Sequence, residues 1–210
     1  MTDRLLLVDS DLFVLLSAAG LLDELAAALG FTPDAIRRLT ALPHQVRKGR
    51  TFRRYDESLR QAVAARCEAA LPLDEQPDKR AFGRLLSVDG IDEGEAFLFA
   101  TLFERPACLL TTGDGRSLVA LGQAPELQDV RDQVRGRIVP LEAALILLVR
   151  RLGATVVGAR LKPLAAIHRT IDIVFGTKDE FDDAEAVRQI TSYLDSLRHS
   201  MGDDLLYPVE

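Results

Sequence analysis

Short apolar runs alternate with longer amphipathic or apolar segments along this chain. Three of the runs, residues 4–8, 107–112 and 137–141, are mostly apolar and are bounded by polar residues. Runs of this length and composition predict buried strands of a parallel sheet. The segments between them predict helices over residues 12–29, from residue 33, and over 56–71, 92–104, 114–121, 141–151, 158–174 and 182–200. Strands alternating with helices predict an α/β protein with a central parallel sheet flanked by helices.

Residues with capping and turn chemistry separate these elements. Asp9–Asp11 precedes the first helix, where Asp and Ser are preferred N-cap residues, and Gly30 is suited to end that helix. Asp92, with Glu95 three residues later, fits a capping box at the start of another helix. Two prolines mark residues 71–79 as a loop.

The composition is that of a folded globular chain. Apolar residues make up 48% and charged residues 28% of 210 positions, which is enough for a core and excludes wholesale disorder. The longest early uncharged stretch, residues 12–22, has 11 residues, whereas a membrane helix needs roughly 18 or more. Two isolated cysteines form no zinc or redox motif, so we expect a cytoplasmic protein. We expect one domain over residues 1–176, followed by an acidic helix and tail over 177–210.

The net charge of −6 conceals a strong asymmetry. Residues 37–54 contain seven basic side chains and no acidic one, whereas residues 179–210 contain nine acidic and two basic ones. The basic stretch is either a solvated surface loop or a local attractor for phosphate. If it binds nucleic acid, the residues expected to guide phosphates are Arg47, Lys48, Arg50, Arg53 and Arg54. The acidic tail is then expected to fold back over the basic stretch.

Acidic side chains follow the predicted strands where they end. Asp9 and Asp11 come after the first strand, and Asp114 follows the strand that ends at Thr112. Glu95 lies in the first turn of the helix before that second strand. Right-handed crossovers bring strand ends to one edge of a sheet, so these acids are expected to share a pocket. Clustered carboxylates favour an oxygen-liganded Mg²⁺ or Mn²⁺, which can promote attack on a phosphate, although each acid has helix capping as an alternative role.

Three motifs, in this order and spacing, resemble those of PIN-domain ribonucleases, a family that includes the virulence-associated protein C toxins. Leu5–Leu16 is similar to the opening strand and first acid of that family, Gly90–Ala100 to its central helix, and Leu109–Arg116 to its next strand. The resemblance covers residues 4–175 and implies a three-layer PIN-like fold. It also implies cleavage of single-stranded RNA with Mg²⁺ or Mn²⁺, an antitoxin-like protein partner and a homo-oligomer.

Carried over by position, the resemblance assigns Asp9 as the first acid, Glu95 as the third and Asp114 as the fourth. These three are the implied catalytic residues and metal ligands, with Asp11 assisting in metal binding. Thr112 matches the hydroxyl residue that stands two positions before the last acid.

The second acid of the family has no counterpart in its usual region, because residues 41–49 contain no Asp or Glu. Asp56 or Glu57 is the nearest substitute along the chain. A PIN-like module that binds nucleic acid or protein without turnover is therefore an alternative. Another is a phosphotransferase of the haloacid-dehalogenase type with Asp9 as nucleophile, although that family needs a lysine between its motifs. Two further interpretations stay open: Phe52 and Tyr55 stack on bases or anchor a helix, and His168 is packed rather than catalytic.

Overall fold

The computed structural model describes residues 4–48, 55–176, 180–202 and 205–209. Within these residues the chain forms a five-stranded sheet in which every neighbouring pair is parallel. The strands are β1 (Leu6–Val8), β2 (Ile36–Arg38), β3 (Leu71–Pro72), β4 (Leu109–Thr112) and β5 (Ile138–Pro140). The α/β class with a parallel central sheet is confirmed.

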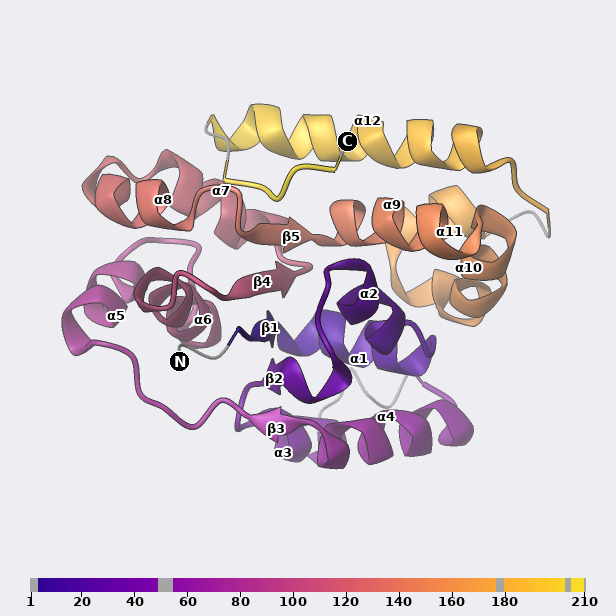
Figure 1. The fold of residues 1–210 in the computed structure, drawn as a ribbon, viewed down its shortest axis with the longest axis horizontal. Coiled ribbons are helices and arrows are strands. Elements are labelled where there is room, and N and C mark those ends of the chain that lie inside the picture. The colour runs from indigo at the N-terminus through magenta and orange to yellow at the C-terminus, as the bar shows by residue number, and fades with distance from the viewer. Residues whose placement is uncertain (1–3, 49–54, 177–179, 203–204, 210) are drawn as a thin grey trace.

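Helices flank this sheet, which is consistent with a three-layer arrangement. In Figure 1, α5, α6 and α8 lie towards the tails of the strand arrows, and α1, α2 and α9 lie beyond their arrowheads. The α-helices in the described residues are α1 (Ser10–Ala18), α2 (Leu22–Ala28), α3 (Leu42–Lys48), α4 (Glu57–Ala69), α5 (Lys79–Leu86), α6 (Glu93–Glu104), α7 (Gly115–Gln123), α8 (Gln128–Val134), α9 (Leu141–Leu152), α10 (Ala154–Leu161), α11 (Arg169–Phe175) and α12 (Asp183–Met201). Short 3₁₀ turns occupy Pro33–Ala35, Pro125–Leu127 and Lys162–Ile167.

The strand order β3-β2-β1-β4-β5 reverses direction between β1 and β4. The chain leaves β1 towards β2 and β3, then returns to the other side of β1 to form β4 and β5. In open parallel sheets the crevice at such a reversal, beyond the carboxyl ends of the strands, is where ligands bind. The fold therefore places the residues after β1 and β4 at the position most suited to a site.

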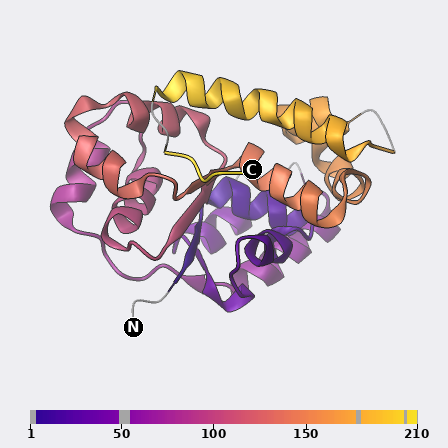
Figure 2. The same cartoon turned by 45° about the horizontal axis from the view of Figure 1, so that its top comes forward.

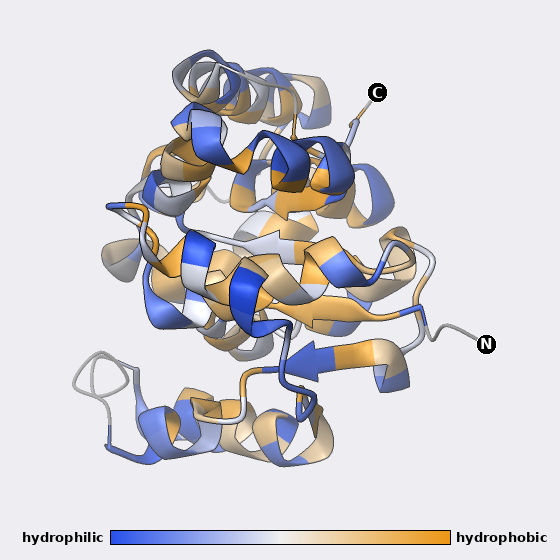
Figure 3. Ribbon diagram, turned by 90° about the vertical axis from the view of Figure 1, so that its left-hand side faces the viewer, coloured by the Kyte–Doolittle hydropathy of each residue, from blue (hydrophilic) through white to orange (hydrophobic). Residues whose placement is uncertain are grey.

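The central strands are buried on both faces, as expected of a sheet between two helical layers. Leu6, Leu7 and Val8 of β1 have no exposed surface, and Ile36 and Leu110 on the neighbouring strands are likewise buried. Each such side chain stabilises the fold by roughly 1.5–3 kcal/mol relative to full exposure. Figure 3 shows mostly apolar strands in the interior, with polar residues concentrated on the outer helical surfaces.

Two strands differ from the prediction. Pro33 opens only a 3₁₀ turn, and the chain then enters β2 instead of a helix. Two of the three residues of β2 are arginines, so the segment lacks the apolar run that predicts a buried strand. The guanidinium groups of Arg37 and Arg38 donate hydrogen bonds to nearby backbone carbonyls. The prediction of a loop over residues 71–79 is also wrong at its start, where Leu71–Pro72 forms the short edge strand β3.

Several helices also differ in extent. The single helix expected over residues 12–29 is divided into α1 and α2 at Gly20, whose φ of +63° ends the first helix. The helix expected over residues 158–174 is likewise replaced by α10, a 3₁₀ turn and α11. The sequence interpretation also missed α5 and α8.

The acidic C-terminal segment packs beside the sheet edge that β5 occupies. Helix α12 lies against α9 and α7, and both ribbon views show it running along α9 (Figures 1 and 2). Ile190 and Leu194 are fully buried, and Leu206 forms a parallel bridge with Ile138 of β5. Helix α3, which holds part of the basic stretch, lies at the opposite side of the molecule in Figure 1. The expected fold-back of α12 over the described basic residues is therefore wrong, while the division into residues 1–176 and 177–210 stays a prediction.

No helix in the described part of the chain combines the length and the apolar character required to cross a membrane.

Candidate functional site

An open groove of about 1360 Å³ lies beyond the carboxyl ends of β1 and β4. Its walls are formed by the starts of α1, α6 and α7, by α3, and by the segment before α5. All four acids expected to converge line this one groove: Asp9, Asp11, Glu95 and Asp114. The strand-end argument therefore places them correctly.

Asp9 immediately follows β1 and is joined to β4 through the backbone. Its amide donates a hydrogen bond to the Thr111 carbonyl at 3.0 Å, which continues the strand pairing by one residue. Asp9 occupies the N-cap position of α1, yet its side chain accepts no capping hydrogen bond from that helix. Capping alone therefore does not explain this carboxylate.

The environment of Asp9 disfavours a negative charge. Burial, followed by repulsion from Asp11 and Asp114, raises the pKa of Asp9 to about 6, although the amides of Ser10 and Gly113 partly offset these effects. A carboxylate held close to other acids in a partly buried groove is stabilised when a cation joins the cluster. Asp9 is therefore the strongest candidate ligand in the groove.

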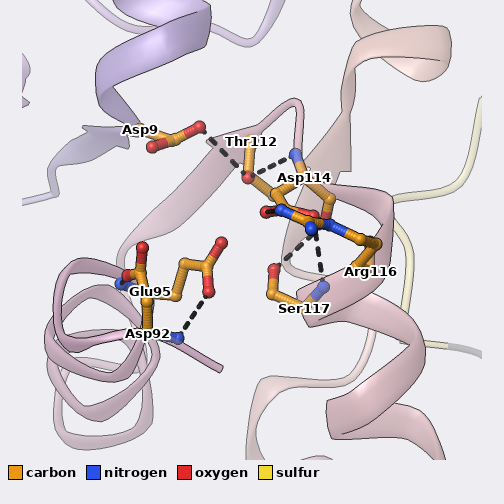
Figure 4. Close-up of polar contacts among 7 residues, drawn as sticks. All are labelled: Asp9, Asp92, Glu95, Thr112, Asp114, Arg116 and Ser117. Atoms are coloured by element: carbon orange, nitrogen blue, oxygen red, sulfur yellow. Dashed lines mark hydrogen bonds and ion pairs between the residues drawn. The ribbon is translucent and has the colours of Figure 1, made fainter. Parts of the chain in front are cut away.

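Thr112, at the end of β4, connects Asp9 with Asp114 (Figure 4). Its hydroxyl lies 3.5 Å from Oδ2 of Asp9 and accepts a hydrogen bond from the Asp114 amide at 3.1 Å. The side chain of Asp114 caps α7, because Oδ1 accepts hydrogen bonds from the amides of Arg116 at 2.8 Å and Ser117 at 3.3 Å. Capping is thus a real role of Asp114, and it fixes the carboxylate at the groove.

Glu95 completes the predicted capping box with Asp92. The Asp92 amide donates to Oε2 of Glu95 at 2.7 Å, and the Glu95 amide donates to Oδ1 of Asp92 at 3.0 Å. Figure 4 shows the Glu95 side chain extending from α6 into the space that Asp9 and Asp114 also face. The capping box therefore holds Glu95 at the groove.

Glu95 and Asp114 titrate as neighbours. Burial, and then the side-chain contact with Asp114, raises the pKa of Glu95 to about 8. Burial also acts to raise the pKa of Asp114, but hydrogen bonds from Glu95 and from the α7 amides outweigh it and the pKa is lowered. These opposite shifts favour the proton on Glu95 and the negative charge on Asp114. The two acids are suited to different roles, one as a proton donor and one as an anionic ligand.

Tyr55 and His168 lie near Asp11 at the groove. Tyr55 is 5% exposed, which agrees with an anchoring role, and burial, then the charge of Asp11, raises its pKa to about 12. His168 is half-buried, and its Nε2 has no hydrogen-bond partner. Burial lowers the pKa of His168, with Asp11 acting in the opposite direction. His168 packs at the start of α11 but also borders the groove.

The donor atoms of the groove are carboxylate, hydroxyl and amide oxygens, which suit Mg²⁺ or Mn²⁺. Within the described ranges no three His, Cys, Asp or Glu side chains are grouped tightly enough to hold a metal ion. Hydrogen bonds engage Glu95 at Asp92 and Asp114 at α7, whereas the Asp9 carboxylate interacts with the amides of Ser10 and Gly113 and lies 3.5 Å from the Thr112 hydroxyl. The donor chemistry suits a hard cation, and Asp9 and Asp114 are the candidate residues to hold one.

The acid that is absent from residues 41–49 is not replaced by Asp56 or Glu57. Asp56 caps α4 by accepting from the Leu59 amide, and Glu57 pairs with Arg60 at 2.6 Å. Neither lines the groove. The α3 wall instead presents Gln45, an exposed neutral amide that sequence reasoning missed.

The described part of the basic stretch lies outside the groove. Arg47 forms an exposed ion pair with Glu68 at 3.7 Å, and Lys48 is exposed. Neither is among the residues that line the groove. The predicted phosphate guides Arg50, Arg53 and Arg54, and Phe52 with them, lie outside the described residues.

Arg116 is a further groove residue that the sequence interpretation missed. Its side chain is 91% exposed and lies 3.5 Å from Oδ2 of Asp114. Among the described lining residues it is the one arginine, and no lysine accompanies it. The signal in the sequence was its place two residues after the strand-end acid.

Comparison with known proteins gives no relative: no family model, no curated protein and no solved structure matches the chain.

Proposed function

We propose that this protein is a divalent-cation-dependent endonuclease of PIN-like fold that cleaves single-stranded RNA. The observation that carries the proposal is Asp9, a carboxylate at the reversal point of the sheet whose pKa is raised to about 6 and whose side chain caps no helix. Ionisation of such a group lowers the free energy of unfolding of the cation-free protein, as is expected of a residue kept for ligand binding. The strand order and the order of the three acidic motifs support the PIN-like assignment.

Each groove residue has a role in this proposal. Asp9 and Asp114 would hold Mg²⁺ or Mn²⁺, with Asp11 assisting, and the cation would supply positive charge that favours attack of water on the phosphodiester. Glu95 retains a proton at neutral pH and is placed to donate it to the leaving oxygen. Arg116 is placed to bind a substrate phosphate at the rim, and Thr112 orients the carboxylate of Asp9.

The partners in this proposal are single-stranded RNA and an antitoxin-like protein, with self-association as a further expectation. The groove itself is acidic, so RNA affinity must come from the bound cation, from Arg116 and from basic residues near its rim. A cytoplasmic location accompanies the proposal.

A second candidate is a PIN-like module that binds without turnover. Gln45 favours it, because the α3 wall offers a neutral amide where the family carries its second acid. The phosphotransferase alternative receives no such support, since no lysine lines the groove in the described chain.

Cleavage of labelled single-stranded RNA in Mg²⁺ or Mn²⁺ discriminates between these candidates. The nuclease proposal expects cleavage by the natural protein and a loss of at least about a hundredfold in Asp9→Asn and Asp114→Asn. Asp89→Asn is a matched control, because Asp89 is exposed and lies outside the groove. Folded protein that binds RNA but never cleaves it would instead support the non-catalytic module.

A further inference from the structure

The wall of the groove formed by α5 and α6 is aromatic, in contrast to the acidic strand ends. Phe82 of α5 and Phe97 of α6 both line the groove and are only half-buried. These two helices pack against each other, and each contributes one phenylalanine to the same groove. An open phenylalanine wall beside the strand-end acids is unexplained by metal binding.

The two rings differ from the aromatic residues that fill the core. Phe99, two positions after Phe97 on the same helix, is 1% exposed, and Phe13 is fully buried. Phe103 is half-buried like Phe97 but lies away from the groove. Partial exposure is thus not shared by all phenylalanines of the fold, and two of the half-buried ones, Phe82 and Phe97, line the groove.

Leu39 extends this apolar wall from the end of β2. A Cβ added to Gly94 would lie 3.3 Å from Cδ1 of Leu39, so the leucine rests directly on the first turn of α6. That turn also carries Glu95, which reaches the carboxylate cluster. The apolar wall therefore adjoins the carboxylate cluster at the first turn of α6.

We propose that Phe82 and Phe97, together with Leu39, form a subsite that stacks on an unpaired nucleobase next to the scissile phosphate. This inference rests on the proposed function and names its substrate more narrowly. Aromatic faces bind bases by stacking with little dependence on sequence, which suits rings that present no hydrogen-bonding group. Paired bases of a duplex are stacked inside the helix and cannot reach such a wall, so the subsite selects single strands.

Polar residues around the subsite are suited to the edge of a base. Gln76 and Glu93 are exposed and line the same groove. At base edges a glutamine amide can both donate and accept hydrogen bonds, and a carboxylate can accept them. The wall thus offers an apolar face together with polar groups at its border, which is the combination that a nucleobase requires.

The test compares two fluorescein-labelled oligomers of equal length, a single-stranded RNA and a sugar-phosphate strand without bases. Binding is measured by anisotropy in Ca²⁺ for the full chain, for Phe82→Leu and Phe97→Leu, and for the matched control Phe103→Leu. Leucine keeps an apolar side chain while removing the ring. We expect the natural protein to prefer the RNA by about tenfold, and each groove variant to lose most of that preference while binding the baseless strand unchanged. We expect Phe103→Leu to behave like the natural protein.

Equal affinity of the natural protein for both strands would overturn the subsite. A loss of preference in Phe103→Leu as large as in Phe82→Leu would also overturn it, because the effect would then come from the fold and not from the groove. Neither result affects the proposed function, which depends separately on metal-dependent cleavage abolished by Asp9→Asn. Metal-dependent cleavage without a binding preference for the RNA would support the nuclease proposal and reject the subsite. If neither the cleavage nor the preference is observed, both proposals are rejected.

Discussion

The hydroxyl of Thr112 lies 3.5 Å from Oδ2 of Asp9, although the two residues are 103 positions apart in the chain. The same hydroxyl accepts a hydrogen bond from the Asp114 amide, so one side chain joins the ends of β1 and β4 at the point where the strand order reverses. This connection fixes the spacing of two acids without neutralising either. The fold thus keeps the carboxylates of Asp9 and Asp114 close together, although like charges repel each other.

Asp9→Asn is expected to stabilise the cation-free protein at neutral pH. Because the pKa of Asp9 rises from 3.8 to about 6 on folding, the folded state binds the proton more tightly than the unfolded state. The free energy of unfolding therefore falls as pH rises from about 4 to about 6 and stays lowered above that range. We expect the free energy of unfolding of Asp9→Asn to exceed that of the natural protein by about 2 kcal/mol at pH 7, and the difference to vanish near pH 4. Urea denaturation across this range measures it, and destabilisation at pH 7 would instead show that the carboxylate is structural.

Asp114→Ala is expected to destabilise the protein, in contrast to Asp9→Ala. Asp114 caps α7 through two amides, and loss of a helix cap costs about 1 kcal/mol. Asp9 accepts no such hydrogen bond from α1, so its removal carries no capping loss. Thermal unfolding in EDTA compares the two variants. A larger loss for Asp9→Ala than for Asp114→Ala would contradict the assigned division of roles.

Gln45→Glu is expected to strengthen cation binding. The substitution places a carboxylate on the α3 wall of the groove, which now presents a neutral amide. One additional charge near a partly solvated cation is worth about 1 kcal/mol, or about fivefold in affinity. Gln133→Glu adds the same charge on α8, away from the groove, and should leave affinity unchanged. Calorimetric titration with Mn²⁺ provides the measurement, and equal responses of the two variants would rule out a specific role for position 45.

Arg116→Gln is expected to weaken RNA binding uniformly across sequences. The exposed guanidinium borders the groove and has one carboxylate neighbour, Asp114. Loss of a single phosphate contact should lower the dependence of log affinity on log salt concentration by about one unit. Arg80→Gln removes an exposed arginine of α5 that does not line the groove. An unchanged salt dependence in Arg116→Gln would remove this residue from the proposed phosphate contacts.

The strand-end acids could be predicted because their positions follow from local patterns. A buried run followed by Asp, as at Asp9 and Asp114, reports both the strand and the edge where the side chain emerges. β2 could not be predicted in this way, since two of its three residues are arginines, and one of them, Arg38, donates a hydrogen bond to the distant Cys67 carbonyl. Tertiary contacts, not local preference, make that segment a strand.

The remaining groove residues were not predictable because they converge from distant segments. Gln45, Phe82 and Arg116 belong to three different helices, and nothing in their immediate neighbourhood marks them as a group. The capping box at Asp92 and Glu95, by contrast, was predicted and is present. Local hydrogen bonding is thus readable from the sequence, whereas the shared surface depends on how the helices are arranged around the sheet.

Mn²⁺ titration of the metal-free protein tests the central claim, that the Asp9 carboxylate belongs to a cation site, most directly. We expect saturable binding that becomes tighter as the pH rises through about 6, because Asp9 has a raised pKa and must be ionised to hold the cation. Asp9→Asn should bind at least about tenfold more weakly, and the exposed control Asp89→Asn should bind as the natural protein does. Equal binding by the natural protein and Asp9→Asn, or no binding by either, would contradict the account.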